Sequence, residues 1–433
     1  MNKINITMVL CICSIFVMSA NTYRLLPPKR GDFAPDKLTG SPIESRSMNE
    51  NREELSFHWL LNPKEAINLY QRPQRTTSSR YSMEIDSTEI PNGITIDTTA
   101  PGAIIRLFAV HGPDEELDLD SSYALLPENM ILVNRNEEAF QGEEAFISFV
   151  SVEEMDEAGF SLPEGTVGFQ INPKLEAGTF TLHIDQYQSE FPLRVHVFEK
   201  DSAYLLNLQM NSDIAFEGSQ ITVYGDLSPS SNMADDASST MRTEQFEAQI
   251  HSPSGAIYPM ETSRTEYGRL MATATLPEKG SISEGLWEVK VKAVLSDSEY
   301  KIIREGETAF SFVQPTARFT GRVEISGMKV ESNIRDDRSS KGISVAFEVD
   351  TAHPGRYEVK GLLFGSSRDG KMYPLAMFDT AVYLEEKGLI EVVLAQETLK
   401  KSGLSAPYKI MGLTLKDQSR LAILSFQREA LTL

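Results

Sequence analysis

Short apolar segments that alternate with polar residues recur along the chain from about residue 82 to the C-terminus. In the run 179–184, three apolar side chains share one face of an extended chain, and Thr181 and His183 share the other face. Alternation with a period of two residues is typical of half-buried antiparallel strands. The pattern predicts an all-β protein built from tandem antiparallel β-sandwich domains of immunoglobulin-like type, preceded by a signal peptide and an irregular N-terminal arm.

Turn residues and prolines divide the chain into segments. Pro315 cannot continue a central strand, so the stretch 314–321 is expected to act as a hinge. Trp287 lies two and four residues before Val289 and Val291, so the three side chains share one face of a strand. Trp287 is therefore predicted to be buried in a core as an anchor. We expect a signal peptide at 1–20, an extended N-terminal arm at 21–80, an N-terminal β-domain at 81–200, an immunoglobulin-like β-sandwich at 201–317 and a C-terminal β-sandwich at 318–433.

Three short segments favour helix over strand. Residues 63–71 are amphipathic and begin with a proline, which the first turn of a helix tolerates. Residues 151–158 open with a serine and a glutamate in the spacing of a capping box. A single helical turn is expected at 397–401, before Gly403.

The first twenty residues have the pattern of an export signal. Lys3 supplies a positive start, an apolar run extends from Ile6 to Val17, and Ser19 and Ala20 are small residues at the expected cleavage position. The apolar run is too short to remain in a bilayer as a spanning helix, and the sequence after it is less hydrophobic. We therefore expect an exported protein without an integral membrane segment.

Both cysteines of the chain, Cys11 and Cys13, lie inside this signal. Cleavage after Ala20 would leave a mature protein without thiols, so its domains must be stabilised by apolar cores and not by disulfides. A lipoprotein signal is the competing interpretation. It is disfavoured because Leu10, directly before Cys11, is not the small residue that precedes a lipidated cysteine.

The chain is strongly acidic, with 62 Asp and Glu against 41 Lys and Arg and a formal net charge of −21. Its basic residues are scattered and form no stripe along the sequence. Nucleic acids and anionic lipid surfaces bind best to clustered basic residues. The excess of acidic residues in this chain therefore disfavours both as partners.

Calcium is the best metal candidate because acidic exported proteins offer many oxygen ligands. Asp114, Asp118 and Asp120 lie within seven residues of one another. The segment lacks the central glycine and the distal glutamate of an EF-hand, so a solvated acidic loop is the competing interpretation. His183 and His196 are not expected to share a metal, because a hairpin between their strands would place His183 opposite about Pro192.

Signatures of nucleophilic catalysis are weak. The nucleophile motif G-x-S-x-G is absent from the sequence, and the segment 365–370 fits a turn between strands. Ser326 and Lys329 match S-x-x-K, a pattern that chance often supplies. A pair of catalytic carboxylates cannot be recognised among 62 acidic residues.

Several sequence segments indicate a resemblance to a known family. They are Ile94–Arg106, Gly285–Val289, Thr308–Arg318, Ala406–Tyr408 and Leu415–Arg420. In these segments the chain resembles an uncharacterised family of exported gammaproteobacterial proteins with tandem immunoglobulin-like β-sandwich domains. The resemblance implies a Gram-negative source and a periplasmic or extracellular location. It implies no activity, and no residue inherits a catalytic role from it.

Two classes of function agree with these observations. The first is an exported non-catalytic binding or structural protein that presents β-sandwich loops to a protein or glycan partner. The alternative is a secreted hydrolase, or a hydrolase accessory protein, whose site is built from dispersed residues. A periplasmic chaperone is a third possibility, and it would require an open sheet edge that accepts a strand of its client.

Overall fold

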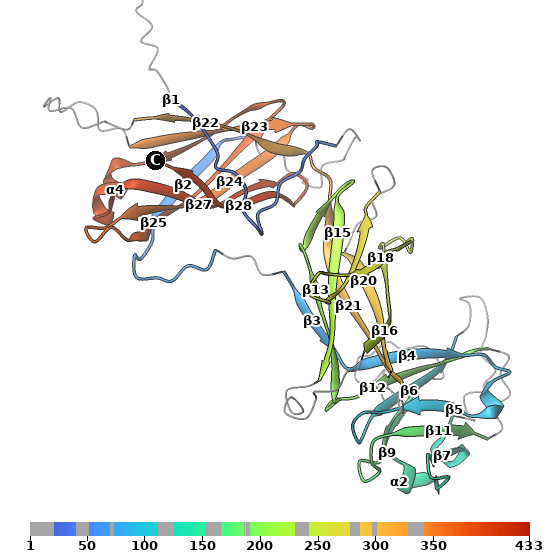
Figure 1. The fold of residues 1–433 in the computed structure, drawn as a ribbon. Coiled ribbons are helices and arrows are strands. Elements are labelled where there is room, and N and C mark those ends of the chain that lie inside the picture. Colours follow the sequence, from blue (N-terminus) through green and yellow to red (C-terminus); the bar gives the residue numbers. More distant parts are fainter. Residues whose placement is uncertain are drawn as a thin grey trace, which may run out of the picture. The chain divides into compact units, whose positions relative to one another are not determined.

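The structure of the chain, a computed structural model, is built almost entirely from antiparallel strands (Figure 1). It describes residues 21–39, 52–69, 73–110, 125–151, 166–185, 187, 191–229, 242–277, 286–296, 301–327 and 342–433. Within these residues the strands of the five sheets follow one another in antiparallel pairs, such as β24 with β25 and β20 with β21, and layered sheets enclose the apolar cores. The prediction of an all-β protein with antiparallel sandwiches is confirmed.

The strands belong to two compact units. Unit 2 takes its residues from 72–312, whereas unit 1 combines the N-terminal segment up to residue 71 with residues 313–433. The chain passes from unit 2 to unit 1 at the end of strand β21, close to Pro315. The expected hinge at 314–321 is shorter than predicted, because a new strand already begins at Ala317.

Unit 2 contains one large sheet and two smaller ones. The large sheet has the order β17 (Ile257–Pro259), β16 (Arg242–His251), β20 (Leu286–Ser296), β21 (Lys301–Val313), β4 (Arg80–Ile85), β12 (Leu193–Phe198), β6 (Ile104–Ala109), β10 (Val167–Ile171) and β9 (Phe146–Ser151), and β14 (Ile214–Phe216) also pairs with β21. A four-stranded sheet has the order β5 (Ile94–Asp97), β11 (Thr179–Ile184), β7 (Met130–Asn134) and β8 (Ala139–Phe140). A five-stranded sheet has the order β18 (Glu261–Arg264), β19 (Leu270–Thr275), β15 (Gln220–Pro229), β13 (Tyr204–Met210) and β3 (Arg75–Ser78). Short helical turns are η1 (Ile90–Asn92), η2 (Pro127–Asn129) and α2 (Gly142–Ala145).

Unit 1 is a sandwich of two sheets. One sheet has the order β1 (Asn21–Arg24), β22 (Ala317–Ser326), β23 (Ile343–Thr351) and β26 (Gly388–Leu394). The other has the order β2 (Leu55–Leu60), β25 (Met372–Leu384), β24 (Gly355–Ser366), β27 (Ser405–Asp417) and β28 (Ala422–Thr432). The helix α4 (Gln396–Ser402) ends at Gly403, which adopts a left-handed conformation, so the predicted helical turn is confirmed.

The N-terminal arm differs most from its sequence prediction. The segment 21–80 was expected to be an extended lead-in, yet β1 and β2 each add an edge strand to a sheet of unit 1 and β3 adds one to unit 2. The predicted helix at 63–71 is wrong for the described residues, since 63 and 64 form a turn and 65–69 have no regular structure. At this turn, the backbone and side-chain oxygens of Asn62 accept bonds from the N–H groups of Glu65 and Lys64.

The large sheet of unit 2 covers two apolar cores with one of its faces. In the half formed by β4, β12 and β6, the buried residues Tyr81, Val195 and Leu107 contribute to a core shared with the four-stranded sheet. In the other half, Trp287, Val289 and Val291 on β20 pack against the five-stranded sheet. Trp287 is buried and lies 4.9 Å between ring centroids from Phe312, which confirms its predicted role as a core anchor.

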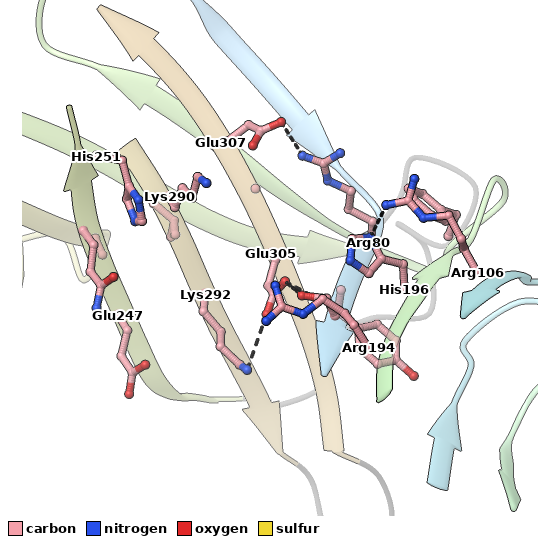
Figure 2. A pocket seen from close by; sticks show the side chains of 17 residues that line it. Arg80, Arg106, Arg194, His196, Glu247, His251, Lys290, Lys292, Glu305 and Glu307 are labelled. Atoms are coloured by element: carbon pink, nitrogen blue, oxygen red, sulfur yellow. Dashed lines mark hydrogen bonds and ion pairs between the residues drawn. The ribbon is translucent and has the colours of Figure 1, made fainter. Parts of the chain in front are cut away.

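The opposite face of the large sheet carries polar and charged side chains. Because successive side chains of a strand point to opposite faces, the neighbours of the buried residues project outward. Figure 2 shows this for Arg80 on β4, His196 on β12, Lys292 on β20 and Glu305 on β21. The outer face therefore continues across both halves of the sheet.

The two halves meet at a narrow seam between β21 and β4. A single residue pair, Glu305 with Arg80, is in register there. Beside it, the Glu305 carboxylate accepts bonds from the backbone N–H and the hydroxyl of Ser82, at 3.0 and 2.6 Å. A side chain thus supplies part of the hydrogen bonding that a longer backbone ladder would give.

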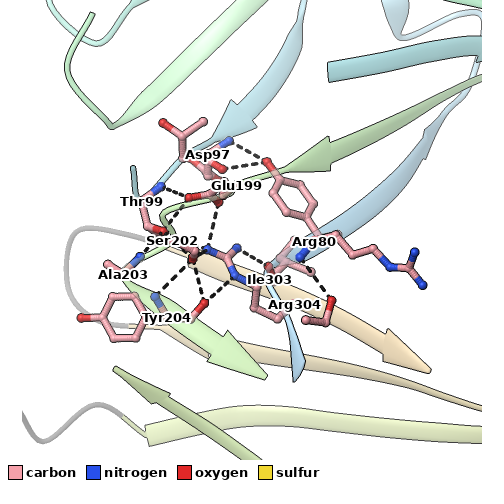
Figure 3. A network of polar contacts seen from close by, with 12 residues as sticks. Arg80, Asp97, Thr99, Glu199, Ser202, Ala203, Tyr204, Ile303 and Arg304 are labelled. Carbon is pink, nitrogen blue, oxygen red and sulfur yellow. Dashed lines mark hydrogen bonds and ion pairs between the residues drawn. The ribbon is translucent and has the colours of Figure 1, made fainter. Parts of the chain in front are cut away.

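A buried ion pair lies under this seam, on the core side of the sheet. Arg304 Nη2 is 2.9 Å from Glu199 Oε1, and the two side chains are 1% and 0% exposed (Figure 3). Arg304 belongs to β21, next to Glu305, whereas Glu199 directly follows β12. The pair therefore joins the two halves of the large sheet from below.

Hydrogen bonds complete the surroundings of both charges. Arg304 donates to the carbonyl of Tyr204 at 3.0 Å and to the hydroxyl of Ser202 at 2.7 Å, and Glu199 accepts from the backbone N–H of Thr99 at 2.7 Å. Burial lowers the pKa of Arg304, and the Glu199 carboxylate opposes that shift. Burial also raises the pKa of nearby Tyr81, whose hydroxyl donates to the carbonyl of Asp97 at 2.8 Å. The guanidinium and Glu199 Oε2 thus have hydrogen-bond partners, whereas Glu199 Oε1 has its ion-pair contact with Arg304.

In unit 1, a second electrostatic contact fastens the N-terminal arm. Glu429 on β28 accepts from Lys29 of the arm and from Lys409 of β27, the latter at 2.7 Å. The hydrogen bonds from Lys29 and Lys409 lower the pKa of Glu429 to about 2. Phe33 of the arm also forms a β-bridge with Phe426, and the two rings stack.

The Glu429 contact should make unit 1 sensitive to acid. Its folded-state pKa lies below the ordinary value of 4.5, so the stabilisation is present above about pH 4.5 and is lost as the pH falls toward 2. We expect Glu429→Gln to lower the unfolding temperature at pH 7 and to flatten its decline between these pH values. Glu397→Gln, which alters an exposed pair with Lys401, is the control and should change the profile less. Parallel pH profiles for the wild type and Glu429→Gln would contradict this assignment.

The seam pair should dominate the stability of unit 2. Glu199→Gln leaves a buried guanidinium without its countercharge, and breaking a buried pair in this way costs about 3–5 kcal/mol. Glu307→Gln is the matched control, because its pair with Arg80 is exposed and contributes about 0–1 kcal/mol. Urea unfolding followed by tryptophan fluorescence measures both in a Trp59→Phe background, where Trp287 of unit 2 is the remaining tryptophan. Equal effects of the two substitutions would show that the seam is not held by the ion pair.

Candidate functional site

The outer face of unit 2 is hollowed above the seam. The hollow has a volume of about 600 Å³, within the range of small-molecule sites. Its lining comes from β16, β20, β21, β4, β12 and β6, so strands from both halves of the large sheet contribute. The polar lining residues are Arg80, Ser82, Arg106, Arg194, His196, Glu247, Gln249, His251, Lys290, Lys292, Glu305 and Glu307.

The alternation of each strand places these side chains. On β20, Val289 and Val291 face the core, so Lys290 and Lys292 face outward. On β12, Val195 and Val197 are buried in the same way, and Arg194 and His196 project from the outer face. The residues that form the cores thus also determine which side chains line the hollow.

The lining reverses the charge balance of the chain. Five Lys and Arg side chains face three glutamates in the hollow, whereas the whole chain has 41 basic and 62 acidic residues. The glutamates are held by neighbours: Glu307 lies 2.5 Å from Arg80 Nη2, and Glu305 lies 3.4 Å from Lys292 Nζ. Arg194 pairs with Glu84 on the adjacent strand. Figure 2 shows the pairs of Glu307 with Arg80 and of Glu305 with Lys292 in the hollow.

Arg106 on β6 differs from the other cations of the hollow. Among the residues that the structure describes, no carboxylate lies within ion-pair distance of its guanidinium, and its buried Nε has no hydrogen-bond partner. Its Nη2 lies 2.9 Å from Nδ1 of His196, and its guanidinium carbon lies 5.5 Å from the ring centroid of Phe108. Burial, with Arg80 as a lesser cause, lowers the pKa of Arg106.

His196 is neutral in this environment. A guanidinium only donates, so Nδ1 of His196 must accept and the ring proton resides on Nε2. Burial and then the charges of Arg106, Arg194 and Arg80 lower the pKa of His196 to about 4. The site therefore presents three guanidinium groups around an uncharged imidazole, an arrangement suited to an anionic group.

The calcium candidates cannot be placed in the structure. Asp114, Asp118 and Asp120 lie in 111–124, outside the described residues. Within the described parts of the chain, no three or more His, Cys, Asp or Glu residues are grouped so that they could hold a metal ion. The calcium site remains a prediction from the sequence.

The other residues singled out in the sequence are dispersed. The hairpin considered for the strands of His183 and His196 does not form, because β11 pairs with β5 and β7 whereas β12 pairs with β4 and β6. The segment 365–370 is a hairpin turn between β24 and β25, as predicted. Ser326 ends β22, and Lys329 of the S-x-x-K pattern lies outside the described residues.

The hollow itself was not predicted from the sequence. The alternation of β12 was one signal that could have indicated it. Arg194 and His196 lie on one face of this strand, and the residues of its other face are buried. The pairing of β21 with β4 joins residues more than 220 positions apart, and sequence alternation does not reveal that contact. Part of the membrane prediction can be compared with the structure: among the described residues, no helix is long and apolar enough to span a bilayer.

Comparisons with known proteins concern the family and the fold. Residues 46–199 match the N-terminal domain model, and residues 327–433 the C-terminal domain model, of a domain of unknown function, DUF4785. No curated protein matches the chain. A solved structure of trypsin-activated alpha-2-macroglobulin from Escherichia coli gives a TM-score of 0.19 at 11% identity, covering 82% of this chain and 30% of that chain, which is too low to support any inference.

A crystal structure of a DUF4785 family protein from Legionella pneumophila is far more similar. The two chains share 19% identity with a TM-score of 0.63, and the alignment covers 94% of this chain and 98% of the Legionella chain. At this identity the match concerns the fold. The resemblance to a family of gammaproteobacterial proteins is confirmed, and two family models together with this solved relative show that the chain belongs to the DUF4785 family.

Proposed function

We propose that this protein is an exported, non-catalytic binding protein whose anionic ligand occupies the hollow on the outer face of unit 2. One observation carries the proposal: Arg106 keeps a partly desolvated guanidinium without a carboxylate partner among the described residues, in a chain with a net charge of −21. An acidic chain has many carboxylates with which to neutralise an arginine. An arginine left without one is suited to receive a negative charge from a ligand.

The state of the titratable groups supports binding over catalysis. Nδ1 of His196 accepts from Arg106, so the imidazole offers only a donor to a ligand and is not poised as a base. Glu305 and Glu307 are fixed by Ser82, Lys292 and Arg80. These carboxylates of the hollow are thus engaged by neighbouring groups, which favours recognition of an anion over catalysis.

Export is the second element of the proposal. The support is the charged, apolar and small-residue pattern of residues 1–20, together with the location of both cysteines within it. A thiol-free mature chain stabilised by sheet cores is compatible with an oxidising compartment.

The export proposal predicts a defined N-terminus. Expressed in a Gram-negative host, the full chain should be recovered from the periplasm or medium, and mass spectrometry should find Asn21 as its first residue. Ile12→Arg interrupts the apolar run and should retain the uncleaved precursor in the cytoplasm. Recovery of the wild-type protein only as an uncleaved cytoplasmic chain would exclude export.

The binding proposal predicts a salt-sensitive affinity for anions. Arg106→Glu places a negative charge among Arg80, Arg194 and His196, so binding of a fluorescent polyanion such as polyglutamate should be lost. Lys371→Glu has the same charge change on the exposed hairpin of unit 1 and is the matched control. Fluorescence anisotropy at increasing salt provides the measurement. Equal losses in both variants would indicate a response to net charge and would exclude a localised site.

A further inference from the structure

We infer that the ligand of the hollow is an anionic saccharide, that is, a chain of hydroxylated rings that carries carboxylate or sulfate groups. This inference rests on the proposed binding function and specifies the chemical class of the ligand. It follows from three properties of the lining. The backbone groups of its strands are already paired with neighbouring strands, its side chains include both hydrogen-bond donors and acceptors, and few of them are apolar.

The backbone under the hollow is already paired. β20 lies between β16 and β21, and β12 lies between β4 and β6, so each of these strands has a neighbour on both sides. At the seam, where β21 and β4 share a single registered pair, the N–H of Ser82 donates to Glu305. A peptide that binds by adding a strand needs unpaired backbone groups at a sheet edge. Recognition in the hollow must instead rely on side chains.

Those side chains offer both donors and acceptors. Arg106, Lys290 and the Nε2–H of His196 donate, whereas the carboxylates of Glu247 and Glu305 accept. A simple anion such as sulfate uses donors only. Sugar hydroxyls both donate and accept, so a saccharide uses the glutamates as well as the cations, and its acidic substituents pair with the guanidinium groups.

Apolar groups make a small contribution to the lining. Tyr81, Ala248 and Val291 lie on strand positions whose side chains face the cores, so Phe198 supplies the aromatic surface on the outer face. Peptide grooves typically provide apolar pockets for anchor side chains. Because few apolar side chains line this hollow of about 600 Å³, it matches a hydroxylated ligand better than an acidic peptide with apolar anchors.

Arg106 is assigned the acidic substituent of the saccharide. Its partner His196 holds one edge of the guanidinium at 2.9 Å, and the ring of Phe108 supports one face. The remaining donors can then form paired bonds with a carboxylate or sulfate. Lysine cannot reproduce this planar arrangement, so Arg106→Lys should bind less tightly than the wild type although it keeps the charge.

Isothermal titration calorimetry of the mature protein tests this inference. The probes are a short oligogalacturonate, its neutral methyl ester, a sulfated chondroitin oligosaccharide, polyglutamate and inorganic sulfate. We expect at least one acidic saccharide to bind more tightly than polyglutamate and sulfate. The methyl ester should bind at least about tenfold more weakly than oligogalacturonate, because the ester removes the charged partner of the guanidinium. Oligogalacturonate carries carboxylates alone, whereas the chondroitin oligosaccharide carries carboxylates and sulfates, so their relative affinities show whether sulfate strengthens binding.

The variants are Arg106→Gln and Arg106→Lys, with Lys371→Gln as the control in unit 1. Arg106→Gln should lower saccharide affinity at least about tenfold, and Lys371→Gln should not change it. The methyl ester comparison uses the wild-type protein, so it tests the inference even where a variant folds poorly.

The outcomes separate the inference from the function on which it rests. Polyglutamate that binds the hollow as tightly as the acidic saccharides would overturn the saccharide inference and leave an anion-binding protein. Equal affinity for oligogalacturonate and its methyl ester would overturn the requirement for charge. Absence of binding to every anion would overturn the proposed function as well.

Discussion

The ion pair between Arg304 and Glu199 is the interaction on which the organisation of unit 2 depends. It lies where two sheet halves, each with its own apolar core, share a single registered residue pair. Two charges without water are tolerated only when each is compensated, and the bonds from Thr99 and to Ser202 and Tyr204 provide that compensation. The ion pair joins the two halves of the sheet at the seam, which lies between the two apolar cores.

This arrangement leaves one face of the large sheet free for recognition. Both cores lie against the same face, so the opposite face crosses the seam without interruption. At the seam the strands share little backbone pairing, and the side chain of Glu305 bridges the gap. The hollow is therefore a product of how two sandwiches are joined, and its charged lining combines residues from both.

Sequence reasoning predicted strands well and their partners poorly, for a physical reason. Alternation is a local property, so it located β11, β12 and β20 closely and correctly buried Trp287. The choice of a partner strand depends on contacts between distant residues. For this reason a hairpin between β11 and β12 could be considered from the sequence, although the two strands belong to different sheets. The hollow was missed for the same reason, since Arg80 and Glu305 are brought together only by folding.

The N-terminal arm gives the chain an unusual order of assembly. β1 pairs with β22 and β2 pairs with β25, so the first strands of the chain are completed by strands more than 290 residues later. All of unit 2 is inserted between these partners. In a polypeptide that emerges N-terminus first, the arm has to wait unpaired while the intervening unit folds. The later strands then close the sandwich around the earlier ones, so unit 1 reaches its native state only after β27 and β28 have been synthesised.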